Sequence, residues 1–239
     1  MKRLMIALTM VFGLSADINA GEPKATQTLT IKQQKLVIIS SLTAKGNLDD
    51  LKITLNSALT SGLTVNEIKE TIVHLYAYCG FPRSIRGLQT FMAVLEERKA
   101  KGINDKQGAV ATPVKDKRSK YERGKETLAK LTGAPQNGAR TGYAAFAPEI
   151  EVFLKEHLFA DIFERDILTY AERELVTIAV LSSIGGVEPM LKSHLGICLN
   201  VGLSAGQLQQ FVELIRSVAG GKEADAAAII LNEVLKDKK

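Results

Sequence analysis

The feature that most constrains this chain of 239 residues is an imperfect internal repeat. The segment GNLDDLKITLNSALTSGLT, from Gly46, aligns without a gap on GVEPMLKSHLGICLNVGLS, from Gly186. A repeat of this kind predicts two copies of one folding unit. The shared positions are mainly leucines and helix-ending glycines: Gly46, Leu51, Leu55, Leu59, Gly62 and Leu63 recur as Gly186, Leu191, Leu195, Leu199, Gly202 and Leu203.

The polar residues of the two copies differ. Across the repeat, His194, Glu174 and His74 stand opposite Thr54, Gln34 and Leu214. The shared scaffold therefore does not require these imidazole and carboxylate groups. We expect the two copies to have different chemical roles.

Five capping boxes predict where helices begin. In each, a Ser or Thr hydroxyl can accept from an orphan N–H while a Glu or Gln three residues later bonds back. The pairs are Thr30–Gln33, Thr64–Glu67, Ser119–Glu122, Thr169–Glu172 and Ser204–Gln207. Apolar residues recur three and four apart between these signals, and no segment alternates for long like a strand. The chain is therefore expected to be all-α, a tandem repeat of helical bundles.

The first unit is expected at residues 28–102, with helices at about 30–45, 48–61, 65–79 and 82–101. Residues 103–118 are polar and lack periodicity, which indicates an exposed linker. The second unit, 119–236, adds the helices YERGKETLAKLTG and PEIEVFLKEHLF before its repeat helices at about 170–184, 188–200, 205–218 and 223–236. Stretches such as LVTIAVL are apolar nearly all round, so we expect the units to pack on each other or on further subunits.

Composition excludes some partners. Aromatic residues make up 5% of the chain and Trp is absent, which is a poor composition for stacking on single-stranded nucleic acid. Much of the net charge of +5 lies in the leader, the linker and the C-terminal tail. Because no basic face with readout residues is indicated, we expect no nucleic-acid partner.

Residues 1–20 have the pattern of a signal peptide. Lys2 and Arg3 precede the apolar run LMIALTMVFGLS, and Ala20 offers a small residue for cleavage before Gly21. The run is too short to span a bilayer comfortably, although an uncleaved anchor is the alternative. We expect a periplasmic or secreted protein with no membrane contact after cleavage.

The cysteines and histidines give no metal site. Cys79 and Cys198 each sit among apolar residues, which favours buried free thiols over a disulfide. The three histidines are scattered without the spacing of metal ligands, and His157 is expected to be a solvated helix residue.

Two parts of the chain resemble the carboxymuconolactone decarboxylase family. The stretch ERELVTIAVLSSIGGVEPMLKSHLGICLNVGLS is similar to the central part of that family, where an Arg-Glu-x-Val-Thr-x-Ala helix precedes a helix with one His. The stretch LTVNEIKETIVHLYAYCGFPRSIRGLQTF is similar to its C-terminal part, with a His-x-x-x-Tyr-x-Gly-x-Pro signature. The resemblance implies an all-helical oligomer, with three tandem chains forming a pseudo-hexamer, and decarboxylation of a small carboxylated lactone without a cofactor.

A sister branch, the alkyl hydroperoxidase D-like proteins, uses Cys-x-x-Cys followed by His four residues later. Counted back from His194, the two Cys positions hold Met190 and Val187. Neither side chain can become a thiolate, so the dithiol peroxidase chemistry of that branch is not expected here.

The resemblance points to site residues in both units. His194 is a candidate general acid or base, and Glu174 is a candidate for orienting it. The alternatives are a half-buried His and an acidic residue favoured by a helix N-terminus. Arg165 and Arg173 are candidates for binding a substrate carboxylate, or else for surface ion pairing with Glu164 or Glu172. His74 and Tyr78 share a helix face in the first unit, where they either line a pocket or close the bundle.

Two function classes remain open. The first is an exported enzyme acting on a small carboxylated lactone or cyclic acid by His/Glu proton transfer. The second is a non-catalytic helical oligomer that binds a small ligand or a partner. Export counts against the usual catabolic role, because aromatic ring-cleavage products arise in the cytoplasm. We further expect one composite site shared by the two units, the rival being that both sites have decayed.

Overall fold

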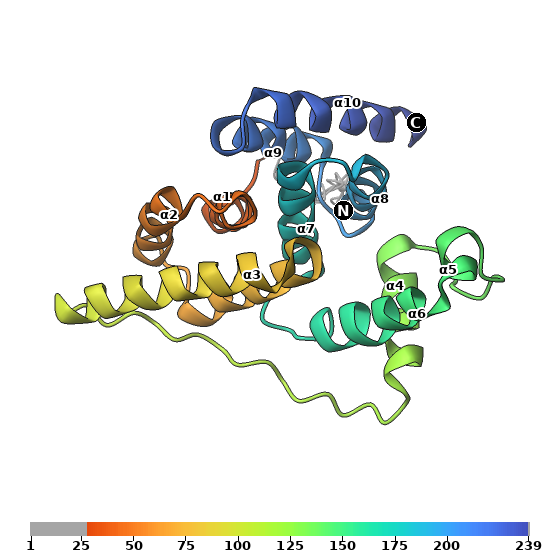
Figure 1. Cartoon of the computed structure of the whole chain (residues 1–239), viewed down its shortest axis with the longest axis horizontal. Helices are drawn as coiled ribbons and strands as arrows, with labels where there is room; N and C mark the ends of the chain where they lie inside the picture. The colour runs from red at the N-terminus through yellow and green to blue at the C-terminus, as the bar shows by residue number, and fades with distance from the viewer. Residues whose placement is uncertain (1–27, 239) are drawn as a thin grey trace, which may run out of the picture.

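The computed structural model describes residues 28–238, and within them every regular element is helical (Figure 1). The all-α prediction is confirmed. The leader 1–20 lies outside the described residues. The elements are α1 (Ile31–Lys45), α2 (Leu48–Thr60), α3 (Val65–Ala100), α4 (Lys120–Thr132), α5 (Gly142–Phe146), α6 (Pro148–Phe153), the π-helix η1 (Leu154–Ile162), α7 (Tyr170–Ile184), α8 (Glu188–Asn200), α9 (Ala205–Val218) and α10 (Gly221–Asp237).

All five expected capping boxes are formed, at the starts of α1, α3, α4, α7 and α9. At α7, for example, the Thr169 hydroxyl accepts from the Glu172 N–H while the Glu172 carboxylate accepts from the Thr169 N–H. These local bonds satisfy orphan donors that each helix start would otherwise leave open. Each of these helix starts is therefore encoded by two residues that lie three positions apart in the sequence.

The repeat recurs in three dimensions. Helices α1 and α2 correspond to α7 and α8, and α3 corresponds to α9 followed by α10. The matched Gly62 and Gly202 have φ of 99° and 96°, in the left-handed region where a Cβ is strained. Gly80 and Gly220 also match, with φ of 77° and 124°, and the backbone leaves the helical conformation at both. The two segments of α3 on either side of Gly80 agree with the expected helices 65–79 and 82–101, and the hydrogen bond from the Ser84 hydroxyl to the Ile72 carbonyl shows that the second folds back on the first.

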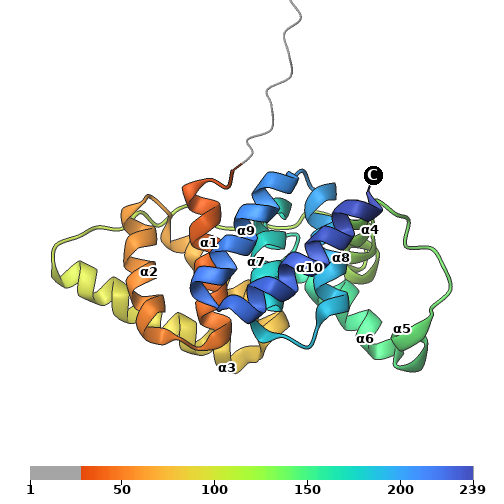
Figure 2. The same ribbon diagram turned by 90° about the horizontal axis from the view of Figure 1, so that it is seen from above.

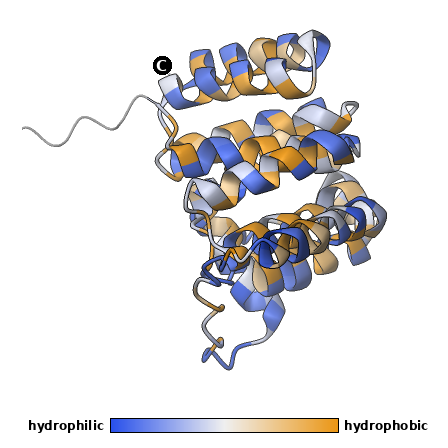
Figure 3. Cartoon of the chain, turned by 90° about the vertical axis from the view of Figure 1, so that its left-hand side faces the viewer, coloured by the Kyte–Doolittle hydropathy of each residue, from blue (hydrophilic) through white to orange (hydrophobic). Residues whose placement is uncertain are grey.

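The two central helices, α1 and α7, pack against each other and each also touches the other unit's third helix (Figures 1 and 2). The apolar core of the second unit includes Leu29 and Val37 from the first. The core of the first unit includes Val176 and Val180 from the second. Figure 3, coloured by hydropathy, shows apolar positions in the stacked layers of helices. Mutual burial explains why α7 is apolar nearly all round.

The helix expected over PEIEVFLKEHLF differs from the prediction. It begins as α6 and widens into the π-helix η1, which packs on α4. A Cβ at Gly124 of α4 would lie 1.7 Å from the Lys155 carbonyl oxygen, so only glycine allows this close approach. The short helix α5 lies in the Gly- and Ala-rich loop where none was expected.

The linker, residues 103–118, has no helix or strand and runs along one edge of the molecule from the end of α3 to α4 (Figure 1). Its carbonyl groups cap α3: the N–H groups of Val65 and Asn66 donate to the Lys106 and Gln107 oxygens, both at 2.9 Å. The linker is therefore attached at the start of α3. No helix among residues 28–238 is long and apolar enough to span a membrane.

Candidate active site

The two residues expected to transfer protons meet inside the second unit. Glu174 on α7 and His194 on α8 form a hydrogen bond of 2.7 Å between the carboxylate Oε2 and Nδ1 of the ring. The Glu174 side chain is fully buried, whereas 14% of the His194 side chain is exposed. A carboxylate at Nδ1 fixes the ring's orientation, and among residues 28–238 Nε2 of His194 makes no hydrogen bond.

Helix α3 of the first unit supplies the opposite side of this site. The Tyr78 ring lies 5.3 Å from the His74 ring and 6.0 Å from the His194 ring, centroid to centroid, with the second pair edge-on. His74 is fully buried. The structure therefore brings together residues from both units, as the composite-site hypothesis requires.

Arg165 and Arg173 do not stand free to bind a ligand carboxylate. Arg165 forms a two-pronged pair with the Glu70 carboxylate, and Nη2 of Arg173 lies 2.7 Å from the Glu70 Oε1. The expected alternative partners are also wrong, because Glu164 pairs with Arg123 and Glu172 with Lys32. Both guanidinium groups instead hold an internal carboxylate.

Sequence reasoning missed Glu70. Its side chain is 2% exposed and that of Arg173 is fully buried, so this ion pair lies deep between the units. The repeat contained a signal for it, because Gln210 stands opposite Glu70 just as Gln34 stands opposite Glu174. A carboxylate replaced by its neutral isostere in the other copy marks a charge that the fold alone does not require.

Two hydrogen bonds hold the buried His74 ring. Its Nδ1 lies 3.3 Å from Nη1 of Arg173, and its Nε2 lies 2.9 Å from the Thr177 hydroxyl. Burial, and then the neighbouring positive charges of Arg173 and His194, hold the pKa of His74 well below its usual range. His74 is therefore a neutral ring inside the protein.

The neutral His74 makes stability depend on pH. The unfolded chain binds a proton at His74 near pH 6.5 and the folded chain does not, so stability rises with pH through this region. Below about pH 6.5, His74 should lower the free energy of unfolding by up to about 1.4 kcal/mol for each pH unit. His74→Leu copies Leu214 of the other unit. In this variant the free energy of unfolding, measured with urea, should change less with pH between pH 7.5 and 5.5 than in the unaltered protein. An identical slope in both proteins would contradict this.

Three buried polar atoms around the site have no hydrogen-bond partner among the described residues: the Tyr78 hydroxyl, Nε of Arg173 and Oε1 of Glu174. Such atoms are rare in folded proteins and usually mark a place for a ligand or an ordered water. Burial, followed by the Glu174 charge, raises the pKa of Tyr78, so its phenol keeps its proton. The site therefore offers a hydroxyl donor beside a carboxylate acceptor.

The equivalent place in the other half is filled by the chain itself. There, Gln210 and Gln34 stand for Glu70 and Glu174, and both bind the main chain of Leu29. The Leu29 side chain is 3% exposed and joins the core of the second unit. Only one of the two pseudo-equivalent places thus retains ionisable groups.

The cysteines have the environment of inert thiols. Cys198, one turn beyond His194, is buried, and burial together with the Glu174 charge raises its pKa well above the usual value. Burial also raises the pKa of Cys79 to about 11. The structure keeps both as free thiols rather than as a disulfide. His157 is half-exposed and pairs with Asp161.

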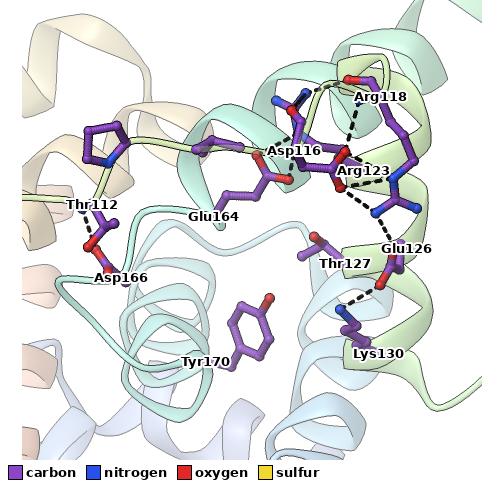
Figure 4. Close-up of a pocket in the computed structure, with 12 residues that line it drawn as sticks. Thr112, Asp116, Arg118, Arg123, Glu126, Thr127, Lys130, Glu164, Asp166 and Tyr170 are labelled. Atoms are coloured by element: carbon purple, nitrogen blue, oxygen red, sulfur yellow. Dashed lines mark hydrogen bonds and ion pairs between the residues drawn. The ribbon is translucent and has the colours of Figure 1, made fainter.

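A separate cavity of about 320 Å³ lies between the linker, α4 and the start of α7 (Figure 4). It contains none of the candidate residues from the sequence. Its charged groups are paired with one another, Arg118 with Asp116 and Glu126, and Arg123 with Glu164. Within residues 28–238 the structure shows no cluster of three or more side chains suited to a metal ion.

Comparison with known proteins gives the family. A sequence model described as "Carboxymuconolactone decarboxylase family" matches residues 15–91 and again residues 148–233, together more than half of the chain. The chain belongs to the carboxymuconolactone decarboxylase family. A 4-carboxymuconolactone decarboxylase of Acinetobacter baylyi is 29% identical over 119 residues, which cover 49% of this chain and 88% of that protein. The two matched stretches agree with a tandem arrangement of two family units.

Proposed function

We propose that this member of the carboxymuconolactone decarboxylase family is an enzyme that decarboxylates a small carboxylated lactone or cyclic acid. The observation that carries the proposal is the part-buried Glu174–His194 hydrogen bond of 2.7 Å, next to buried polar atoms that have no partner among residues 28–238. A carboxylate-oriented imidazole that keeps partial exposure is suited to general acid–base work near neutral pH.

The chemistry needs one proton at carbon. In the substrate class proposed, the bond between the ring carbon and the carboxylate breaks, CO₂ leaves, and the electron pair moves towards the lactone carbonyl. His194, protonated on Nε2, then returns a proton to the ring carbon as the carbonyl re-forms. The net reaction consumes one proton from solvent through the imidazole, and Glu174 stabilises the imidazolium form.

The arginines have a different role from the one expected. Because Arg165 and Arg173 already bind Glu70, we assign them to holding the first unit against the second rather than to binding the substrate carboxylate. Nε of Arg173 is a buried donor without a partner among the described residues, in the same guanidinium group whose Nη1 contacts His74. It is a candidate for binding a ligand oxygen or an ordered water.

The test is CO₂ release from 4-carboxymuconolactone and a panel of small carboxylated lactones. His194→Thr, which copies Thr54 of the other unit, should lower kcat by about 10²–10⁴-fold. Thr54→Ala at the equivalent position is the control and should leave kcat unchanged. Absence of CO₂ release from the whole panel, with saturable binding of the same compounds, would instead favour a non-catalytic binding protein.

A peroxide assay tests whether the protein is a thiol peroxidase. With neither cysteine activated, we expect no peroxide turnover, and Cys198→Ala should not alter decarboxylation. The leader supports the further proposal that the protein acts in the periplasm or is secreted, where its substrate would differ from cytoplasmic ring-cleavage products. A homo-oligomer, with three tandem chains forming a pseudo-hexamer, is likewise proposed.

A further inference from the structure

We propose that Tyr78 is a second catalytic group, which donates a hydrogen bond to the substrate oxygen that gains negative charge as CO₂ leaves. A directed series of donors runs beside it from Arg173 through His74 to Thr177, whose free proton is the one available to orient the Tyr78 hydroxyl. The inference rests on the proposed function and adds a named group for the oxygen, whereas Glu174 and His194 serve the carbon. Each link follows from which atoms can donate.

The first link fixes the tautomer of His74. A guanidinium group has donors and no acceptor, so the contact of 3.3 Å between Nη1 of Arg173 and Nδ1 of His74 requires Nδ1 to accept. The ring is fully buried and its pKa is depressed, so it does not carry a second proton. The single ring proton of His74 therefore lies on Nε2.

The second link follows from the first. With the proton on Nε2, His74 donates to the Thr177 hydroxyl oxygen at 2.9 Å. This leaves the Thr177 hydroxyl proton free, and among residues 28–238 this hydroxyl makes no other hydrogen bond. Thr177 and Tyr78 both lie against the His74 ring, and the Tyr78 hydroxyl has no hydrogen-bond partner among these residues. We infer that the free proton of Thr177 turns towards the phenol oxygen.

The last link ends at the ligand side. The Tyr78 hydroxyl is buried without a hydrogen-bond partner among the described residues, while its ring lies edge-on to His194. Both donors in the series, Arg173 and His74, point away from Glu70, which anchors the positive charge of Arg173 at the far end. Hydrogen bonds aligned in this way polarise one another and make the terminal hydroxyl a stronger donor.

These donors stabilise the negative charge of the reaction without transferring a further proton. As the carbon–carboxylate bond breaks, its electron pair moves to the carbonyl oxygen, to which Tyr78 donates a hydrogen bond while keeping its proton. The raised pKa of Tyr78 opposes loss of that proton. Preorganised donors aimed at a developing oxyanion are commonly a large part of enzymatic rate enhancement.

The equivalent place in the other unit lacks these hydrogen-bonding residues. The positions equivalent to His74, Thr177 and Tyr78 hold side chains that neither donate nor accept: Leu214, Val37 and Val218. The fold is thus built equally well without these polar groups. Their presence together in one half, beside Glu174 and His194, is explained by a shared chemical role.

The tautomer is tested without turnover. In ¹⁵N-labelled protein, the His74 ring should show an unprotonated Nδ1 and a protonated Nε2 throughout pH 5.5–8. A proton on Nδ1, or a charged ring in this range, would overturn the chain. Because the measurement needs no substrate, it stands or falls separately from the proposed function.

The catalytic role is tested by three variants in the CO₂-release assay. Tyr78→Phe should lower kcat by about 10²–10³-fold with little change in KM. Thr177→Val, which copies Val37, should lower kcat by about 10–100-fold, and Thr177→Ser should restore most of it. Unchanged kcat in Tyr78→Phe, or equal losses in the Val and Ser variants at matched melting temperatures, would overturn the proposal. No turnover by the unaltered protein would instead reject the proposed function.

Discussion

Glu70→Gln should lower the free energy of unfolding by about 3–5 kcal/mol, a large part of the stability of a protein this size. Glu70 is the carboxylate that pairs with the fully buried Arg173. Removing one partner of a buried ion pair leaves the other charge without compensation in a medium that solvates it poorly. The loss should appear in urea unfolding as a lower midpoint with an unchanged slope.

The same helix supplies a matched control. Glu97, also on α3, pairs with Lys52 where both side chains are 46% exposed, and Glu97→Gln should cost at most about 1 kcal/mol. Comparing the two variants separates the effect of burying the ion pair from the effect of losing a carboxylate. Equal effects of the two substitutions would show that the Glu70–Arg173 pair does not hold the units together.

Glu174→Gln should have the largest effect on catalysis, a loss in kcat of about 10²-fold or more. Glutamine keeps the shape of the side chain but removes the charge that orients His194 and stabilises its protonated form, and its amide can also hold the wrong tautomer. The substitution should be measured in CO₂ release, with KM determined in parallel.

Glu174→Gln should leave the stability unchanged or raise it, although it lowers catalysis. Oε1 of Glu174 is buried and unpartnered, so replacing the carboxylate removes a poorly compensated charge. Gln34 occupies the equivalent position of the other unit, where the fold accepts it. We therefore expect an unchanged or higher melting temperature together with lost activity. A fall in melting temperature with full activity would mean that Glu174 serves the fold.

The sequence predicted best those features that are encoded over a few neighbouring residues. The capping boxes are confirmed because each needs only a hydroxyl and a Glu or Gln three residues apart. The repeat also predicted that α7 would be buried on several sides, since its stretch LVTIAVL has no polar face. Two of the candidate residues, Glu174 and His194, meet because they occupy fixed positions on adjacent repeat helices.

Features that depend on contacts between distant segments were not predicted. The π-helix η1 has no local signal in the sequence, and its close approach to Gly124 is a contact between segments that lie far apart in the chain. The arginines were expected to bind a ligand because their internal partner, Glu70, lies on the other unit, about a hundred residues away. Position in the repeat marked these residues as unusual, but only the fold shows what they contact.

The central claim is that residues of both units form one ligand site. Its most direct test is NMR titration of the protein with 5-oxotetrahydrofuran-2-carboxylate, a small carboxylated lactone that lacks the conjugation needed for decarboxylation. The account predicts saturable shifts of the Tyr78 ring and the His194 imidazole, with no shift of the Thr54 and Leu214 methyl groups at the equivalent places. Shifts confined to one unit, or centred on Thr54 and Leu214, would contradict it.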